Sequence, residues 1–189
     1  MPEANRRILG IDPGTVSTGF GLVEGSGAYT AYLSSGTIRT EPGDAIAGRL
    51  KKIYDGLLNT IAEFHPSAVA IEGTFIDKNS QSALKLGQAR GVAILVAAQS
   101  GLPVFEYAPA QVKMAVVGYG AATKVQIRIM VTRLLKMPRE PESEHAADAL
   151  AVALCHLHTA RFDEVAKNGE YVPTRLPARQ VRRITGRRT

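Results

Sequence analysis

The sequence has only one cysteine, Cys155, in 189 residues. One cysteine cannot form a disulfide within the chain, which excludes the class of small secreted domains held together by disulfide bonds. The first residues, MPEANRR, lack the basic segment followed by an apolar one that marks a secretory signal. We therefore expect the protein to work in the reducing cytoplasm.

Long hydrophobic runs are also absent. The most apolar stretch, Gly91 to Ala98, is far shorter than the roughly 20 residues that a membrane-spanning helix needs. Hydrophobic residues still make up 45% of the chain, and its length falls within the roughly 100–200 residues of a typical domain. We predict a single globular domain with no membrane partner.

The formal net charge of +6 is unevenly distributed along the chain. Basic and acidic residues are equal in number from residue 1 to residue 165, whereas residues 166–189 carry Lys167 and six arginines against Glu170 alone. Such a segment cannot bury a core, and its charge attracts phosphate through counterion release. We predict a domain over residues 1–165 and a flexible basic tail over residues 166–189, which serves either solubility or DNA binding.

Short apolar runs between turn residues predict five strands, the first three of them antiparallel. Four helices are expected from length and termination signals, and a fifth from apolar residues that recur at three- and four-residue steps between Ile46 and Phe64. The predicted strands are Ile8–Asp12, Gly19–Val23, Tyr29–Ile38, Ala68–Ile71 and Pro103–Tyr107, and the remaining helices are Ser80–Gln99, Ala110–Val117, Lys124–Lys136 and Ser143–Phe162. The order βββαβαβααα indicates an α/β fold with a mixed sheet flanked by helices.

Two of these strands end in a carboxylate. Asp12 ends the first strand and Glu72 follows Ile71 at the end of another, and charge at the interior of a sheet is costly unless it is paired or bound to a cation. Neighbouring strands would bring the two acids together, and their repulsion would raise a pKa unless a divalent ion is present. Residues 10–15 also resemble the nucleotide-binding turn of the actin, Hsp70 and sugar-kinase superfamily, so the first motif alone leaves both alternatives open.

A third carboxylate lies in the last predicted helix. His145 and Asp148 are three residues apart and so share one helix face, beside alanines that allow a close approach to the sheet. Ser143 as the N-cap and the helix dipole explain Glu142 and Glu144, but not an acid one turn into an apolar sequence. Two strand-end acids and a helical His/Asp pair provide the oxygen-rich ligands that two-metal phosphodiester hydrolysis requires.

Five motifs, in order, resemble the RuvC family of Holliday-junction resolvases. They are residues 8–14 (ILGIDPG), 70–72 (AIE), 82–91 (SALKLGQARG), 103–107 (PVFEY) and 146–151 (AADALA), and the resemblance extends from Ile8 to about His158. It implies a ribonuclease H-like fold with a five-stranded mixed sheet, three strands antiparallel and two parallel. It also implies a homodimer that binds four-way DNA junctions and makes paired nicks with 5′-phosphate and 3′-hydroxyl ends, in recombination and DNA repair.

The same resemblance implies roles for individual residues. Two divalent cations, Mg²⁺ or Mn²⁺, would be held by Asp12, Glu72, His145 and Asp148. The likeness places Lys113 and Lys124 near the scissile phosphate, where a positive charge offsets developing negative charge. DNA contacts are expected from Phe75, Lys78, Lys85 and Arg90, and the branch-migration proteins RuvA and RuvB are the expected partners.

His145 stands where many members of that family carry aspartate. Replacing a carboxylate with a softer nitrogen ligand favours Mn²⁺ over Mg²⁺, so we predict a manganese preference. Two other functions remain open from the sequence. The first is an ATP-using actin-like protein, but such proteins generally build their nucleotide cleft from two such domains, and we expect one here. The second is a junction-binding protein without catalysis, but carboxylates without bound metal would repel the phosphates of the DNA.

Overall fold

The computed structural model describes residues 6–26, 29–73 and 80–167, and for 80–82 and 161–167 it describes the backbone only. Phe75, Lys78 and nearly all of the expected basic tail lie outside these residues. The elements, in chain order, are β1 (Arg6–Asp12), β2 (Ser17–Ser26), β3 (Tyr29–Arg39), α1 (Ile46–Phe64), β4 (Ala68–Glu72), α2 (Ser80–Gln99), β5 (Val104–Tyr107), α3 (Pro109–Val117), α4 (Lys124–Leu134) and α5 (Glu144–Lys167).

The five strands form one mixed sheet in the order β3-β2-β1-β4-β5. β1 pairs with β2 and β2 pairs with β3 in antiparallel fashion, whereas β4 runs parallel to both β1 and β5. The predicted α/β class, element order and strand directions are confirmed. None of the described helices combines the length and hydrophobicity that a bilayer crossing requires.

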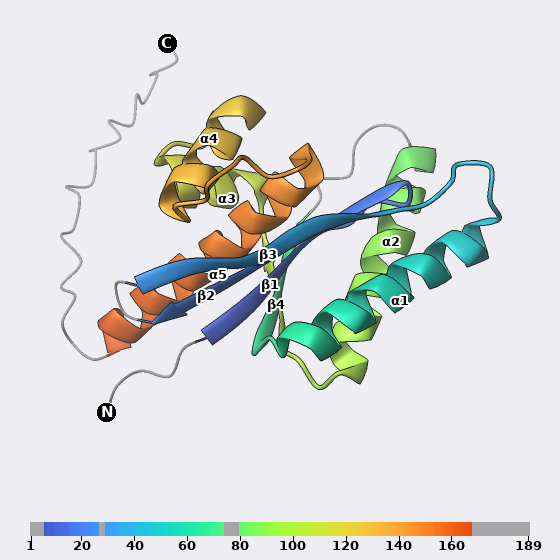
Figure 1. Ribbon diagram of the computed structural model, residues 1–189, viewed down its shortest axis with the longest axis horizontal. Helices are drawn as coiled ribbons and strands as arrows, with labels where there is room; N and C mark the ends of the chain where they lie inside the picture. The colour runs from blue at the N-terminus through green and yellow to red at the C-terminus, as the bar shows by residue number, and fades with distance from the viewer. Residues whose placement is uncertain (1–5, 27–28, 74–79, 168–189) are drawn as a thin grey trace, which may run out of the picture.

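Helices cover both faces of the sheet. Because side chains alternate along a strand, Ile8 of β1 joins the core cluster that includes α5, while Leu9 and Ile11 join the opposite cluster with α1 and α2. Figure 1 shows α1 and α2 on one side of the sheet and α3, α4 and α5 on the other. The two clusters together fix which face each strand-end side chain occupies.

α5 lies directly on the sheet because glycines face it. A Cβ added at Gly10 of β1 would overlap the carbonyl oxygen of Ala149, and one added at Gly19 of β2 would overlap that of His145. On the helix side, Ala149 and Ala153 keep the contact surface small. Backbone therefore meets backbone at this interface, and the N-terminal turns of α5 are held close to the carboxyl end of β1.

Two helix ends differ from the sequence prediction. α4 ends at Leu134 instead of Lys136, because Lys136 takes a positive φ of 50° and Met137 donates its N–H to the carbonyl of Thr132. This hydrogen-bonding pattern closes the last turn as glycine often does, but with a lysine. α5 continues beyond Phe162 to Lys167, so the first two residues of the expected tail are helical.

Candidate active site

Asp12 and Glu72 lie side by side at one edge of the sheet. β1 and β4 are parallel neighbours with Ile11 opposite Ile71, and each strand ends at the next residue, which is the acid. The alternation of side chains places both carboxylates on the face that α5 covers, because Ile11 and Ile71 pack in the opposite cluster. The prediction that two strands deliver their acids to one place is thus borne out by the topology.

The first turn of α5 is anchored to the sheet. Ser143 caps the helix by accepting a hydrogen bond of 3.0 Å from the N–H of Ala146, and its hydroxyl lies 2.6 Å from that of Thr37 in β3. His145 then reaches the end of β1, where its Nδ1 lies 2.7 Å from Oδ2 of Asp12. The helical His/Asp pair therefore meets the first strand-end acid.

Lys124 from the start of α4 contacts the third carboxylate. Its Nζ lies 3.4 Å from Oδ2 of Asp148 and 3.4 Å from Oε2 of Glu144. Thr123 caps α4 by accepting a hydrogen bond of 3.3 Å from the N–H of Gln126, which fixes where the helix begins and where Lys124 projects. A cation thus bridges two acids from the first turns of α5.

The electrostatics shows that the acids form one cluster. Burial, followed by the charges of Asp12 and Asp148, raises the pKa of Glu72 from 4.5 to about 7, while Lys124 and Lys113 act in the opposite direction. Burial also raises the pKa of Asp148, against the lowering influence of Lys124. Three carboxylates therefore repel one another at the edge of the sheet where β1 and β4 end, and positive charge there would stabilise their ionised forms.

The pKa values of the two basic partners, His145 and Lys124, are raised as well. The hydrogen bond to Asp12 raises the pKa of His145 above its ordinary value, and the negative charge of Asp148 raises that of Lys124. Both shifts favour the protonated form of the base. The protonated side chains of His145 and Lys124 therefore neutralise part of the negative charge of the cluster.

The donor set fits divalent cations, although the side chains are not yet arranged around one point. Within residues 6–26, 29–73 and 80–167, no group of three histidine, cysteine, aspartate or glutamate side chains could hold a metal ion as it stands. His145 and Lys124 contact the oxygens of Asp12 and Asp148 instead. Carboxylates and one imidazole are ligands that Mg²⁺ and Mn²⁺ accept, and the raised pKa of Glu72 reports a site that cations would stabilise.

The other residues singled out in the sequence have different surroundings. Lys113 on α3 is half-buried and near enough for its charge to lower the pKa of Glu72. Lys85 is exposed on α2, and Arg90 of the same helix forms an ion pair with Glu106 of β5. Lys113 therefore accompanies the acids, whereas Lys85 and Arg90 belong to a helix on the opposite face of the sheet.

Sequence reasoning missed two features of the site. Arg128 lines the same small depression as Lys124 and Asp148, and its position four residues after Lys124 could have indicated a shared helix face. Arg49, buried on α1, donates from Nε to the carbonyl of Thr15 at 3.1 Å and so secures the turn that follows Asp12. No sequence signal marks this second contact, because it links residues 34 positions apart.

Comparison with known proteins gives a consistent family. Residues 8–156 match the family model described as crossover junction endodeoxyribonuclease RuvC. Relatives of that name from Pelobacter propionicus and Pelotomaculum thermopropionicum are 52% and 51% identical. The matches cover 81% and 85% of this chain, and 86% and 98% of the relatives.

Two solved structures extend the likeness to the fold. The structure of Thermus thermophilus RuvC in complex with a Holliday junction substrate superposes with a TM-score of 0.80 at 35% identity, covering 84% of this chain and 96% of that one. The yeast mitochondrial Holliday junction resolvase has a TM-score of 0.62 at 13% identity, with 87% and 83% of the two chains covered. The second likeness concerns the fold alone.

Proposed function

Because the chain belongs to the RuvC family of crossover junction endodeoxyribonucleases, we propose that it resolves four-way DNA junctions by paired, symmetric nicks. It is a divalent-metal-dependent endonuclease of DNA recombination and repair. The observation that carries this function is the convergence of Asp12, Glu72 and Asp148, where burial, followed by the charges of Asp12 and Asp148, raises the pKa of Glu72 to about 7. Such crowding of acids at a sheet edge suits a nuclease that works with bound cations.

The residues have distinct tasks in this reaction. The cations would be held by Asp12, Glu72, His145 and Asp148. When bound, two divalent cations supply an activated water nucleophile and stabilise the leaving oxygen of the phosphodiester. Lys113 and Lys124 offset the negative charge that grows on the phosphate during attack, and the hydrogen bond from His145 orients Asp12.

Cleavage of a synthetic four-way junction tests the function. We expect metal-dependent paired nicks with 5′-phosphate ends in the junction, and no comparable cutting of a linear duplex of the same sequence. Asp12→Asn and Asp148→Asn should each lower the cleavage rate by a factor of about a thousand or more, because each removes a charged ligand. Gel analysis of end-labelled junction strands measures both results.

The controls separate catalysis from binding and from nucleotide chemistry. Both variants should still bind the junction in Ca²⁺, as measured by fluorescence anisotropy, because uncharged amides do not repel phosphate. Asp55→Asn, at an exposed ion pair on α1, should cut at the wild-type rate. Hydrolysis of ATP by the wild type, or junction binding with no cleavage in either metal, contradicts the proposal.

We propose that His145 gives the site a preference for Mn²⁺ over Mg²⁺, because an imidazole nitrogen is a softer ligand than a carboxylate oxygen. The rate of junction cleavage in Mn²⁺ divided by that in Mg²⁺ should fall at least severalfold in His145→Asp. Titration of each metal against the cleavage rate measures the effect for both proteins. An unchanged ratio removes this role from His145.

A homodimer is also proposed, since two symmetric cuts need two active sites. The support is an exposed apolar strip on α2, which we define as Leu84, Gly87, Gly91 and Leu95. A Cβ added at either glycine would meet no described atom within 4 Å, so the glycines do not serve packing on their own sheet. Leu84 and Leu95 are 65% and 50% exposed, as expected for a surface that a second copy covers.

The remaining proposals concern partners and location. RuvA and RuvB are the proposed branch-migration partners, and the cytoplasm is the proposed location because bacterial DNA is repaired there. We propose that Phe75, Lys78 and Lys85 contact the DNA. For Arg90 the proposal requires release from Glu106, to which it is ion-paired. An unpaired base at the crossover could stack on Phe75, and the lysines would meet phosphates.

A further inference from the structure

Arg128 lies one turn after Lys124 on α4 and faces the same depression. This hollow is lined by Lys124, Val125, Arg128, Glu144, Ala147 and Asp148, so it joins the start of α4 to the first turns of α5. Side chains four residues apart on a helix are neighbours on its surface. Arg128 therefore stands beside the lysine that contacts Asp148, on the side leading away from the carboxylate cluster along α4.

One ion pair holds the guanidinium of Arg128 in place and leaves most of its N–H donors outside that contact. Its Nε lies 2.9 Å from Oε2 of Glu140, in the loop between α4 and α5, and the side chain is 36% exposed. The pair is close but not aligned as a hydrogen bond, because Nε is buried and has no hydrogen-bond partner among the described residues. An arginine carries five N–H donors, so contact through Nε leaves the four donors of its two Nη groups outside this ion pair.

The charge balance of the depression calls for a second cation. Lys124 is shared between Glu144 and Asp148, and these acids would repel a DNA phosphate that approached with Lys124 as its sole counter-charge. A planar guanidinium binds phosphate oxygens through two parallel hydrogen bonds, which a lysine cannot do. Arg128 supplies that group next to the acids.

From these observations we propose that Arg128 is a phosphate-binding residue for the DNA strand being cut. Lys124 lies beside the phosphate that is attacked, and Arg128 would bind the neighbouring phosphate of the same strand. Four residues of helix advance about 6 Å along the axis, so the two basic side chains meet successive phosphates of one strand. This inference rests on the proposed function, and it adds a residue that fixes where along the strand the attacked phosphate lies.

The test compares Arg128→Gln with Arg133→Gln. Arg133 is exposed on the same helix and carries the same charge, but nine residues from Lys124 place it on the opposite side of α4. The dissociation constant for a four-way junction is measured by fluorescence anisotropy in Ca²⁺ at several salt concentrations. Arg128→Gln should bind about tenfold more weakly, with the slope of log K against log[salt] reduced by about one unit. Arg133→Gln should change affinity less than twofold.

Arg128→Lys completes the comparison because it keeps the charge and loses the fork. It should retain the wild-type salt slope and recover part of the affinity, and the cut should spread to neighbouring phosphates if the fork sets the register. Equal weakening by Arg128→Gln and Arg133→Gln would mean that only the general charge of α4 matters, and it overturns the inference. If the wild type cuts the junction in the same experiments, the proposed function stands even though the inference fails. If the wild type neither binds nor cuts the junction, both the inference about Arg128 and the proposed function are overturned.

Discussion

At the scale of single residues, Glu72 and His156 represent opposite responses to burial. Glu72 is a carboxyl whose pKa rises to about 7 because burial and neighbouring acids favour its neutral form. His156 on α5 is 6% exposed, and burial followed by the charge of Arg6 lowers its pKa. The neutral ring is held between Phe105, with centroids 4.4 Å apart, and the hydroxyl of Tyr107, 2.7 Å from Nδ1.

The lowered pKa of His156 predicts a loss of stability in acid. Because the folded protein binds this proton less readily than the unfolded chain, its contribution is fully present above the ordinary histidine pKa of about 6.5 and is lost as the pH falls. His156→Gln cannot take up the proton, so its free energy of unfolding should depend less on pH between about 7 and about 5. The difference in slope should not exceed about 1.4 kcal/mol per pH unit, measured by urea unfolding.

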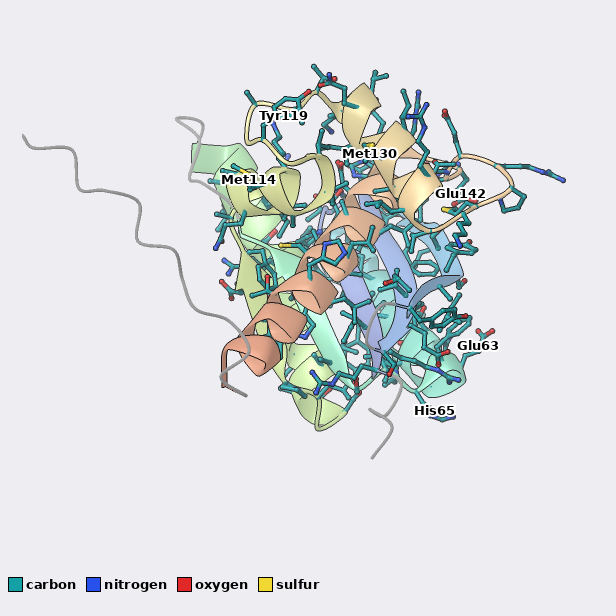
Figure 2. All side chains as sticks on the ribbon, turned by 90° about the vertical axis from the view of Figure 1, so that its left-hand side faces the viewer. Glu63, His65, Met114, Tyr119, Met130 and Glu142 are labelled. Carbon is teal, nitrogen blue, oxygen red and sulfur yellow. The ribbon has the colours of Figure 1, made fainter. Side chains whose placement is uncertain are left out.

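His65 provides the control for this titration. It is exposed at the end of α1, where it takes a positive φ of 48° that asparagine tolerates well. Glu63 and His65 lie at the end of the molecule opposite Met114 and Tyr119 (Figure 2). Because the side chain of His65 is exposed, His65→Asn controls for the removal of an imidazole that is not buried. If the two variants behave alike, burial of His156 is not the cause.

What the sequence revealed about single residues depended on contrast with their neighbours. Asp12 and Glu72 interrupt apolar strands, and Asp148 interrupts an apolar helix, so each could be recognised without coordinates. The pairing of side chains could not be recognised in this way. The contact of His145 with Asp12 spans 133 residues, and its distance depends on rotamers and on how deeply α5 is seated, neither of which has a local signal.

At the scale of elements, the seating of α5 on Gly10 predicts the effect of a single methyl group. Gly10→Ala would overlap the carbonyl of Ala149, and because that atom is helix backbone, the whole helix must move. We expect a loss of about 1–3 kcal/mol in the free energy of unfolding, together with slower cleavage because Asp148 shifts with the helix. Urea unfolding and junction cleavage measure the two effects.

Gly48 on α1 is the matched control. An added Cβ there meets nothing within 4 Å, so Gly48→Ala should be neutral or stabilising by up to about 1 kcal/mol, with unchanged cleavage. A Gly10→Ala protein as stable and active as the wild type would show that α5 does not depend on this close approach.

Element order was predictable because hydrophobic periodicity and turn residues are local features. One helix boundary differed because a residue acts against its type. Lys136 adopts the positive φ that usually indicates glycine, so the end of α4 had no marker in the sequence. The backbone contact between α5 and the sheet was visible only in part, as alanines on one side, because strand pairing was needed to align Gly10 and Gly19 beneath them.

At the scale of the whole molecule, the apolar strip on α2 predicts the oligomeric state. Leu95→Glu places a charge within the proposed interface, and we expect it to convert the dimer into a monomer at micromolar concentration. Sedimentation velocity measures the mass. The monomer should lose paired nicking of the junction more strongly than it loses single nicks.

Leu58→Glu serves as the comparison because Leu58 is also an exposed leucine, 37% accessible, but on α1. That variant should remain a dimer. If both variants keep the wild-type mass, or if the wild type is itself a monomer, α2 is not the dimer interface. Gly87 and Gly91 are four residues apart and so share one strip of the helix, but only the fold shows that this strip faces outward.

The direct contact of α5 with β1 and β2 also affects how the enzyme could be engineered. Where Gly10 and Gly19 meet α5, the distance between the sheet and the helix that carries Asp148 is set by main-chain atoms. The leucines, isoleucines and valines between the sheet and the α1–α2 layer lie on the far side of that contact. Redesign of that layer should therefore raise or lower heat resistance while the spacing that governs phosphodiester cleavage stays constant.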